Sequence, residues 1–345
     1  MSQHLIYVNN SSGIPLMGVD FMGVIDRGTN VIELKPNTTC NLKCKYCFVS
    51  AGDYDTNFIV SSDYLIEKVR EAITIKGAYE IEIHIAPYGE ILLYPELFNL
   101  LEKLKKIQGI ETVSMQSNGL LLTTEIIEKL KILKLTRINL SLNTLNSKMA
   151  EYLCNCSNYD MEKLKDNILH LIKSGIDVLL APVWFPGEND EDIEDIIKYV
   201  IDLRKDGFSE QHIRLGIQKY LVYKTGRRLK KVRPKTWAYF YKQLSLLEKK
   251  YDIKLKLGPL DFGIHKRQSI SRRNFKKGDI IRLKIISKGR WERECVGKID
   301  ENLGIKVLLR KGFTFSTELL GNVIDAKIIK ANYKDNIITA VFPTS

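Results

Sequence analysis

The sequence predicts an α/β protein: a parallel sheet with helices outside it, followed by a small all-β barrel. Two observations support this. Strand-like and helix-like segments alternate between residues 31 and 260, whereas from about residue 274 onward short strand-like segments follow one another between glycine turns. The length of 345 residues exceeds the usual size of one domain, so one large and one small domain are expected.

The N-terminal 30 residues are predicted to form a β-rich lead-in, because turn signals interrupt short apolar segments there. We therefore expect three regions: the lead-in at 1–30, the alternating domain at 31–260 and the β-barrel at 270–345.

The alternating domain is divided by its hydrophobic periodicity. Strands are expected at 31–34, 79–86, 112–116, 137–142, 177–183, 212–218 and, last, 253–257. Helices are expected at 62–75, 95–107, 124–133, 160–174, 190–205 and 236–249. About six strand–helix units fit before residue 220, fewer than the eight of a complete barrel. Alternation alone is equally compatible with an open, doubly wound sheet.

The C-terminal region changes to a strict apolar–polar alternation. Strands are expected at 277–286, 304–309, 321–329 and 336–342. Four or five short strands with glycine turns predict a small closed barrel.

Charge is distributed unevenly along the chain. The net charge is +12, and residues 261–345 hold 18 Lys and Arg against 9 Asp and Glu, or +9. A second basic segment, residues 221–235, holds seven basic residues and no acid. Asymmetry of this size indicates a surface that binds a polyanion, although a solvated face is the simpler interpretation of any charge run.

The sequence also bears on the compartment. We see no apolar run of about 18 residues and no secretory signal, so we expect no membrane segment. Six cysteines, three of them clustered, favour a reducing environment over a disulfide framework. These features predict a cytoplasmic protein.

The cluster is Cys40, Cys44 and Cys47, with the spacing C-x3-C-x2-C. Cubane iron–sulfur clusters are held by thiolates, normally four, so three would leave one iron open. A zinc site is the alternative, but zinc usually takes four protein ligands in pairs and no second pair is present; His84 could complete one.

This cysteine triplet resembles the signature of the radical S-adenosylmethionine (radical SAM) superfamily. The resemblance implies a partial (β/α)6 TIM-like barrel, a [4Fe-4S] cluster, and S-adenosylmethionine on the open iron, which is cleaved to a 5′-deoxyadenosyl radical. It also implies an electron donor such as ferredoxin or flavodoxin. The C-terminal barrel is similar to a TRAM domain, an OB-like RNA-binding barrel.

The resemblance implies a set of residues around S-adenosylmethionine. Tyr46 is the aromatic residue before the last cysteine, and Tyr88-Gly89-Glu90 corresponds to a Gly-Gly-Glu-like turn with Tyr88 in place of the first glycine. The full set is Tyr46, Gly89, Glu90, Ser117, Asn118, Ser141, Asn143 and Gln218. Polar residues on an inward strand face need partners, which favours a ligand beside Ser141 and Asn143.

We predict that the substrate is RNA, with tRNA as its class. The candidate RNA-binding residues are Lys224, Arg227, Arg228, Lys230, Lys231, Arg233, Lys276, Lys277, Arg290 and Lys311. Two alternatives stay open: a radical SAM enzyme acting on a peptide or protein, and a non-catalytic RNA-binding protein with a structural metal.

Methylation, sulfur insertion, rearrangement and hydrogen abstraction share the same cluster, so the reaction is not specified. The roles of Cys154, Cys156 and Cys295 are not specified either, although buried cysteines usually act as small hydrophobes.

Overall fold

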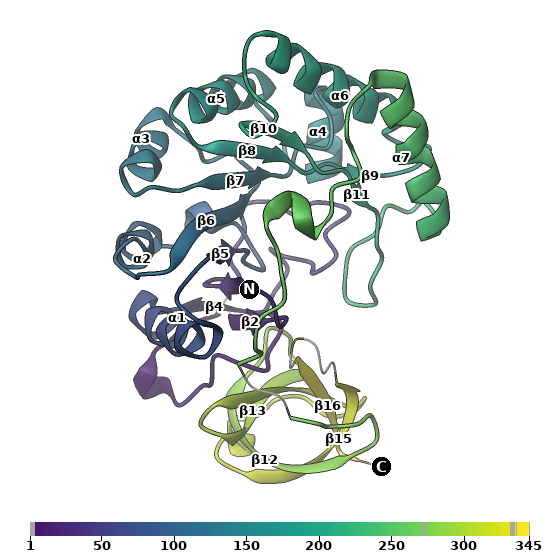
Figure 1. Ribbon diagram of the computed structural model, residues 1–345. Helices are drawn as coiled ribbons and strands as arrows, with labels where there is room; N and C mark the ends of the chain where they lie inside the picture. Colours follow the sequence, from purple (N-terminus) through teal and green to yellow (C-terminus); the bar gives the residue numbers. More distant parts are fainter. Residues whose placement is uncertain (1–3, 271–272, 332–334, 336, 345) are drawn as a thin grey trace. The chain divides into compact units, whose positions relative to one another are not determined.

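The computed structural model describes residues 4–270, 273–331, 335 and 337–344 (Figure 1). The chain separates into two compact units. The first comprises residues 1–39, 53–111 and 264–345, and the second comprises residues 40–52 and 112–263. The predicted domain boundaries stay predictions, and each unit is described by itself.

The first unit contains the beginning of the alternating region. β2 (Gly23–Asp26) pairs antiparallel with β3 (Val31–Lys35), and β3 pairs in parallel with β5 (Ile81–Ile85). β1 (His4–Val8) and β4 (Thr56–Val60) form a separate parallel pair. The other elements are α1 (Ser62–Lys76), α2 (Leu97–Leu104) and the 3-10 helices η1 (Asn10–Ser12) and η2 (Ile91–Leu93). Ser61 caps α1, as its serine signal predicts.

The second unit continues the alternation. β6 (Ile110–Ser117), which begins at the unit boundary, β7 (Arg137–Leu140), β8 (Asp177–Leu180) and β10 (Ile213–Leu215) pair in parallel in that order. A short parallel pair, β9 (Val183–Trp184) and β11 (Gln218–Lys219), follows β8 and β10. The helices are α3 (Thr124–Ile132), α4 (Ser147–Cys154), α5 (Met161–Lys173), α6 (Asp190–Lys205), α7 (Trp237–Tyr251) and η3 (Pro259–Phe262).

The predicted strand–helix alternation is therefore confirmed. β3 and β5 in the first unit, and β6, β7, β8 and β10 in the second, are the strands of the six expected units. Strands β6 to β8 carry apolar residues that are almost fully buried, as expected where helices cover a parallel sheet.

One expected strand is absent. Residues 253–257 form no strand, because the backbone N–H groups of Leu255 and Lys256 both donate to Glu248 Oε1 at 2.8 Å. The Glu248 side chain, near the end of α7, thus takes the backbone N–H groups that a neighbouring strand would otherwise have bound.

The C-terminal region is a closed five-stranded barrel, which confirms the expected small all-β domain (Figure 1). The order around the barrel is β12 (Ile280–Lys288), β13 (Glu294–Asp300), β14 (Leu303–Leu309), β16 (Ile338–Phe342) and β15 (Val323–Ala331). Only the β14–β16 pair is parallel among these described strands. A short 3-10 helix, η4 (Thr317–Leu319), precedes β15.

The barrel interior is filled by aliphatic side chains and by Cys295, which is fully buried. Phe275 and Phe315 pack against this core, whereas Trp291 contacts the ring of Tyr54 at 5.2 Å. Phe313 is 47% exposed. Most of the barrel aromatics therefore have a packing role.

The barrel is attached to the N-terminal segment of its own unit through backbone contacts. The N–H of Gly304 donates to Met17 O at 2.7 Å, and that of Ile338 donates to Gly18 O at 3.0 Å. A Cβ on Gly18 would lie 2.0 Å from Gly304 O, so only glycine permits this approach. Lys306 pairs with Asp20 in the same contact.

A buried ion pair strengthens this attachment and corrects one expectation. Arg290 was a candidate RNA-binding residue, but only 4% of it is exposed, and its Nε and Nη2 donate to the Glu294 carboxylate at 3.0 Å. Its guanidinium lies 4.5 Å from the Phe21 ring centroid, and its carbonyl accepts from Asp55 and Thr56. Arg290 therefore joins the barrel to the lead-in and is not available to a polyanion.

Among the described residues, no helix combines the length and the apolar character needed to cross a bilayer.

We predict that Arg290→Ala destabilises the first unit strongly, because it leaves the buried Glu294 carboxylate without its partner. Breaking such a pair costs about 3–5 kcal/mol. Urea unfolding followed by tryptophan fluorescence measures this loss. Lys284→Ala, at an exposed position of β12, is the control and should change the free energy of unfolding by less than about 0.5 kcal/mol. Equal effects of the two substitutions would contradict the assignment.

Candidate functional site

The three clustered cysteines lie in one loop of the second unit, residues 40–52, called here the cysteine loop. It is built of turns: Cys47 N–H donates to Cys44 O at 3.1 Å, and Ser50 N–H donates to Cys47 O at 3.2 Å. Cys47 Sγ accepts from Ala51 N at 3.4 Å. Backbone amides that point at a sulfur orient the side chain and would stabilise a thiolate there.

Arg227 holds this loop from a distant part of the chain. Its Nε donates to Cys44 O at 2.7 Å, its Nη2 to Ala51 O at 2.8 Å and its backbone N–H to Cys47 O at 2.8 Å. Arg227 was a candidate RNA-binding residue, and this is a correction: its guanidinium is bound to loop carbonyls. A carbonyl outside regular structure needs a donor when it is removed from water, and Arg227 supplies it.

The neighbours of Arg227 complete the contact. Ser50 Oγ donates to Thr225 O at 2.9 Å, and a Cβ on Gly226 would come within 2.5 Å of Phe48 O. The segment 225–227 and the cysteine loop thus approach each other at backbone distance, and glycine at position 226 is required for this.

The cysteine side chains are partly buried, and Cys44 has a thiol neighbour outside the loop. A hydrogen bond with buried Cys154, together with burial, raises the pKa of Cys44 well above its ordinary value, and burial raises that of Cys47. Within the described part of the chain, no three His, Cys, Asp or Glu side chains converge as a metal-binding group. Cys40, Cys44 and Cys47 share one loop, but their side chains do not converge on one point in this arrangement.

Tyr46 and Asn143, two of the predicted cofactor residues, are in direct contact. Asn143 Nδ2 donates to Tyr46 Oη at 2.5 Å, and Asn143 Oδ1 accepts from Val183 N at 2.7 Å. The Tyr46 ring also packs against Phe185, with centroids 4.9 Å apart. Burial and the nearby Cys44 raise the pKa of Tyr46 well above its ordinary value, so the phenol stays neutral.

The carboxyl end of β6 reaches the cysteine loop as well. Asn118 Nδ2 donates to Asn41 Oδ1 at 2.8 Å. Ser117 Oγ accepts from Gly119 N at 2.9 Å, within the turn. Ser141, after β7, accepts from Gln116 Nε2 at 2.9 Å. Polar residues from two neighbouring strand ends therefore lie beside the loop, where parallel sheets bind their ligands.

Gly89 and Glu90 belong to the first unit, where they follow β5. A Cβ on Gly89 would lie 1.9 Å from Thr39 O, and Glu90 N donates to that same carbonyl at 2.7 Å. Thr39 is the residue that precedes Cys40 in the chain. The Glu90 carboxylate is buried and accepts from Leu92 N at 3.0 Å, which caps η2.

Gln218 lies apart from these contacts. It sits on β11, its backbone N–H donates to Pro182 O at 2.7 Å, and its side chain is exposed.

The remaining candidate RNA-binding residues are exposed: Lys224, Arg228, Lys230, Lys231 and Arg233 in the second unit, and Lys276, Lys277 and Lys311 in the first.

Sequence reasoning missed three contributors to the site. Asn41 binds Asn118, Phe185 packs on Tyr46, and Cys154 lies beside Cys44. Of these three residues, only Cys154 had a signal in the sequence, namely the C-x-C pair at 154–156. Asn41 and Phe185 are identified only by their tertiary contacts.

Comparisons with known proteins add the family. The family model described as "Radical SAM superfamily" matches residues 34–200. The uncharacterized protein MJ0103 of Methanocaldococcus jannaschii is 33% identical over 354 residues, covering 97% of this chain and 80% of that protein. GTP 3′,8-cyclase of Peptoclostridium acidaminophilum is 28% identical over 205 residues, which cover 59% of this chain and 59% of that cyclase. GTP 3′,8-cyclase of Aquifex aeolicus is 27% identical over 183 residues, which cover 52% of this chain and 55% of that cyclase. The chain thus spans less than two thirds of these cyclases.

Solved structures share the fold. SuiB of Streptococcus suis bound to S-adenosylmethionine has a TM-score of 0.50 and 21% identity, covering 69% of this chain and 48% of that chain. HydG, a maturase of the [FeFe]-hydrogenase, has a TM-score of 0.52 and 13% identity, covering 69% and 52%. The chain belongs to the radical SAM superfamily, whose enzymes use a [4Fe-4S] cluster and S-adenosylmethionine.

Proposed function

We propose that this chain is a radical SAM enzyme that modifies RNA, with tRNA as the RNA class. Cys40, Cys44 and Cys47 hold the [4Fe-4S] cluster in this proposal, and a ferredoxin or flavodoxin delivers the electron. When bound, the cluster and S-adenosylmethionine supply a 5′-deoxyadenosyl radical for the substrate. The protein contributes ligation, orientation and exclusion of water.

The cysteine loop fits such a cluster by its donor chemistry. Iron–sulfur clusters take thiolates as ligands, and three thiols lie on a loop whose carbonyls are held by Arg227. The Ala51 N–H that donates to Cys47 Sγ and the Arg227 guanidinium that binds the loop carbonyls are outer contacts that orient such ligands. Because Cys44 and Cys47 have raised pKa values as thiols, binding the cluster would release their protons.

The polar strand ends support the proposed place for S-adenosylmethionine. Asn118 and Ser141 lie at the carboxyl ends of β6 and β7, and Asn118 contacts the cysteine loop. Asn143 holds the Tyr46 ring in place through its amide. Gly89, Glu90, Ser117 and Gln218 stay candidates for contacts to the amino acid and adenosine parts.

One observation carries the RNA proposal: the basic segment 221–235, called here the basic loop, is exposed and lacks acids. Apart from Arg227, every basic residue in it is exposed. Such a loop offers several cations to a phosphate backbone, and neutralised phosphates release counterions, which favours binding. A peptide substrate or a purely structural metal site would not require this concentration of positive charge.

The barrel offers a second basic surface. Its β13–β14 side is partly occupied by the lead-in, through Gly304 and Lys306. Its β12–β15 side carries exposed cations that the candidate set omitted: Arg282, Lys284, Lys327 and Lys330. A five-stranded closed barrel is the architecture of OB-type domains, which supports the proposed TRAM-like, RNA-binding role.

A free nucleotide is a second candidate substrate, because several of the matched relatives are GTP 3′,8-cyclases. Anaerobic incubation with GTP and, separately, with tRNA from cells that lack this gene distinguishes the two by mass spectrometry of the products.

We predict that Cys44→Ala abolishes cluster binding and reductive cleavage of S-adenosylmethionine. Loss of one of three thiolates leaves too few ligands for the cluster. Cys154→Ala is the matched control, because it removes the neighbouring buried thiol but not a proposed ligand. Iron and sulfide content and 5′-deoxyadenosine formation, after anaerobic reconstitution with dithionite, measure the outcome. Loss of iron in Cys154→Ala would instead indicate a four-thiolate site and contradict an open iron.

We predict that tRNA binding weakens steeply as salt increases. The double substitution Lys230→Ala and Lys231→Ala should reduce the slope of log affinity against log salt by about 2, because each lysine contacts about one phosphate. The adjacent pair Lys105→Ala and Lys106→Ala, exposed beyond α2, removes the same charge elsewhere and should leave the slope unchanged. Fluorescence anisotropy at several salt concentrations tests this. Identical slopes for the two double variants would remove the main support for RNA binding at the basic loop.

A further inference from the structure

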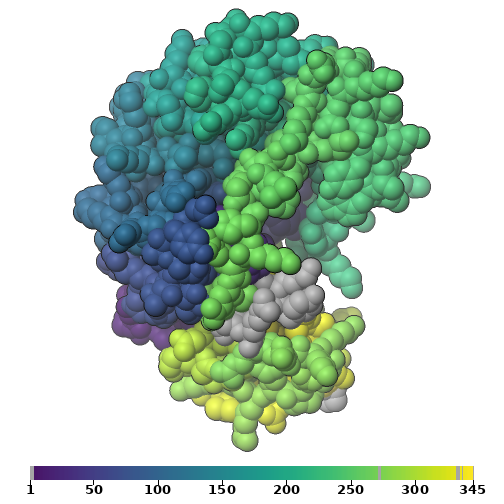
Figure 2. Space-filling view, in the orientation of Figure 1, coloured from purple at the N-terminus to yellow at the C-terminus, as the bar shows by residue number. Residues whose placement is uncertain are grey.

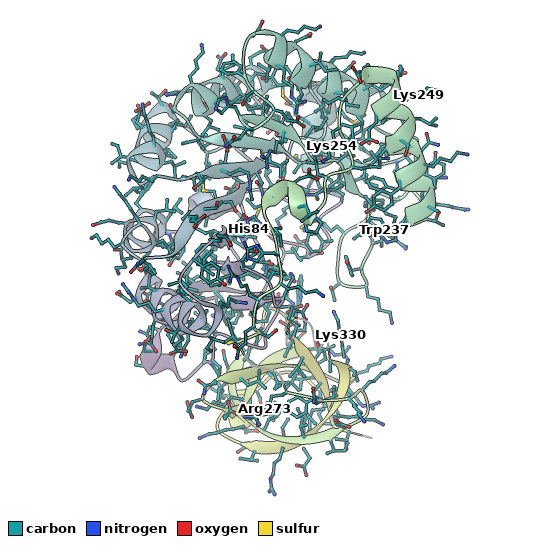
Figure 3. The ribbon with its side chains drawn as sticks, in the orientation of Figure 1. His84, Trp237, Lys249, Lys254, Arg273 and Lys330 are labelled. Atoms are coloured by element: carbon teal, nitrogen blue, oxygen red, sulfur yellow. The ribbon has the colours of Figure 1, made fainter. Side chains whose placement is uncertain are left out.

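A pocket in the second unit lies between β9, β11 and the start of α7. Its lining residues are Trp184, Pro186, Lys219, Tyr220, Lys235, Tyr239 and Phe240. Pairing of β9 with β11 places Trp184 opposite Lys219. Thr236 caps α7 through Tyr239 N, which fixes Lys235 and Tyr239 around the first turn. Figure 3 labels Trp237 and Lys249 at the two ends of this helix.

The pocket wall is aromatic and continues onto the surface. Trp184 packs against Phe240 and Tyr239, with ring centroids 6.1 and 6.5 Å apart. Trp237 and Tyr241 are stacked at 5.8 Å with an interplanar angle of 25°. Trp237 is 52% exposed and Tyr241 is 50% exposed. The green part of the chain, which includes α7, lies on the surface in the space-filling view (Figure 2). Clustered exposed rings of this kind indicate a binding surface.

Two lysines add positive charge at the rings. Lys219 Nζ lies 5.1 Å from the Trp237 ring centroid, and Lys235 Nζ lies 5.6 Å from that of Tyr239. Within the described part of the chain, neither lysine forms an ion pair with a carboxylate, and Lys219 Nζ donates to Tyr220 O at 3.5 Å. The basic loop joins directly onto Lys235. The rim of the pocket therefore offers exposed rings, those of Trp237, Tyr239 and Tyr241, beside cations without a carboxylate partner, which suits a ligand with a planar ring and an anionic group.

The pocket also lies next to the cysteine loop in the packing. Phe185 stands between the lining residues Trp184 and Pro186 in the chain, and its ring contacts Tyr46 at 4.9 Å. Tyr220, another lining residue, packs edge-on against Phe185 at 5.1 Å. A single layer of aromatic side chains thus separates the pocket from the cysteine loop.

We propose that the mouth of this pocket binds one unpaired nucleotide of an RNA strand, with the base stacked on the exposed Tyr239 ring and a phosphate at Lys219 and Lys235. The inference rests on the proposed function and names where the RNA is held. A strand fits better than a free nucleotide because the Trp237–Tyr241 stack and the basic loop extend the same chemistry beyond the pocket. Stacking platforms beside basic grooves are the common solution for single-stranded RNA.

The test uses the full chain and a labelled single-stranded oligoribonucleotide of about 12 nucleotides. Tyr239→Ala should weaken binding at least about fivefold with an unchanged salt slope, since the ring contacts a base and no phosphate. Tyr239→Phe keeps the ring and should bind like the natural protein. Lys235→Ala should lower the slope by about 0.7.

Two controls on α7 match these changes. Leu246→Ala removes an apolar side chain that is 53% exposed, and Lys249→Ala removes an exposed cation at the far end of the helix. Neither should change oligonucleotide binding. A Tyr239→Ala protein that has lost its fold would show an altered thermal transition, and Tyr239→Phe then decides whether the ring is needed.

The possible outcomes are distinct. If the oligonucleotide binds but Tyr239→Ala and Lys235→Ala behave like the controls, the pocket assignment is wrong while RNA binding stands. GTP that binds as tightly as the oligonucleotide, with the same sensitivity to Tyr239→Ala, would overturn the RNA strand in favour of a free nucleotide. No oligonucleotide or tRNA binding by the natural protein would overturn both the pocket assignment and the proposed function.

Discussion

The contact between Arg227 and the cysteine loop is the constraint on which the organisation of the second unit depends. A loop of turns with three cysteines has no strand or helix partners of its own, so its carbonyls must find donors elsewhere. Arg227 supplies its backbone N–H and two guanidinium donors, to three carbonyls along the loop. Bonds from a charged donor are stronger than neutral ones, which suits a loop that must present thiols in one arrangement.

The same contact joins two functions that are far apart in the sequence. Arg227 belongs to the basic loop, whose other cations are exposed, so the proposed RNA-binding segment is anchored at the proposed cluster site. The aromatic layer of Tyr46, Phe185 and Tyr220 continues this connection toward the pocket beside α7. In the first unit, Arg290 plays a comparable part, because it pairs with Glu294 of the barrel and also contacts the Phe21 ring and accepts from the N–H groups of Asp55 and Thr56.

The sequence predicted the features that depend on local pattern. The six strand–helix units, the small barrel and the chain segment of the cysteine loop follow from periodicity, glycine turns and spacing. Arg227 and Arg290 were misassigned because a count of charges does not distinguish a solvated cation from one that is bound to carbonyls or buried with a carboxylate. Glu248 likewise removed a predicted strand by binding two backbone N–H groups, which no apolar alternation reveals. The pocket lies beyond sequence reasoning, since β9, β11 and α7 meet only through tertiary packing.

The facing glycines at positions 18 and 304 have a consequence for how this architecture changes over time. A Cβ at position 18 would lie 2.0 Å from the backbone oxygen of Gly304, a clash that no smaller side chain nearby could relieve. A substitution of Gly18 therefore cannot be compensated simply by a second substitution nearby. Few sequence changes are tolerated where the lead-in contacts the barrel. Variation in descendants of this chain should accumulate in the loops at the open ends of the barrel rather than at this seam.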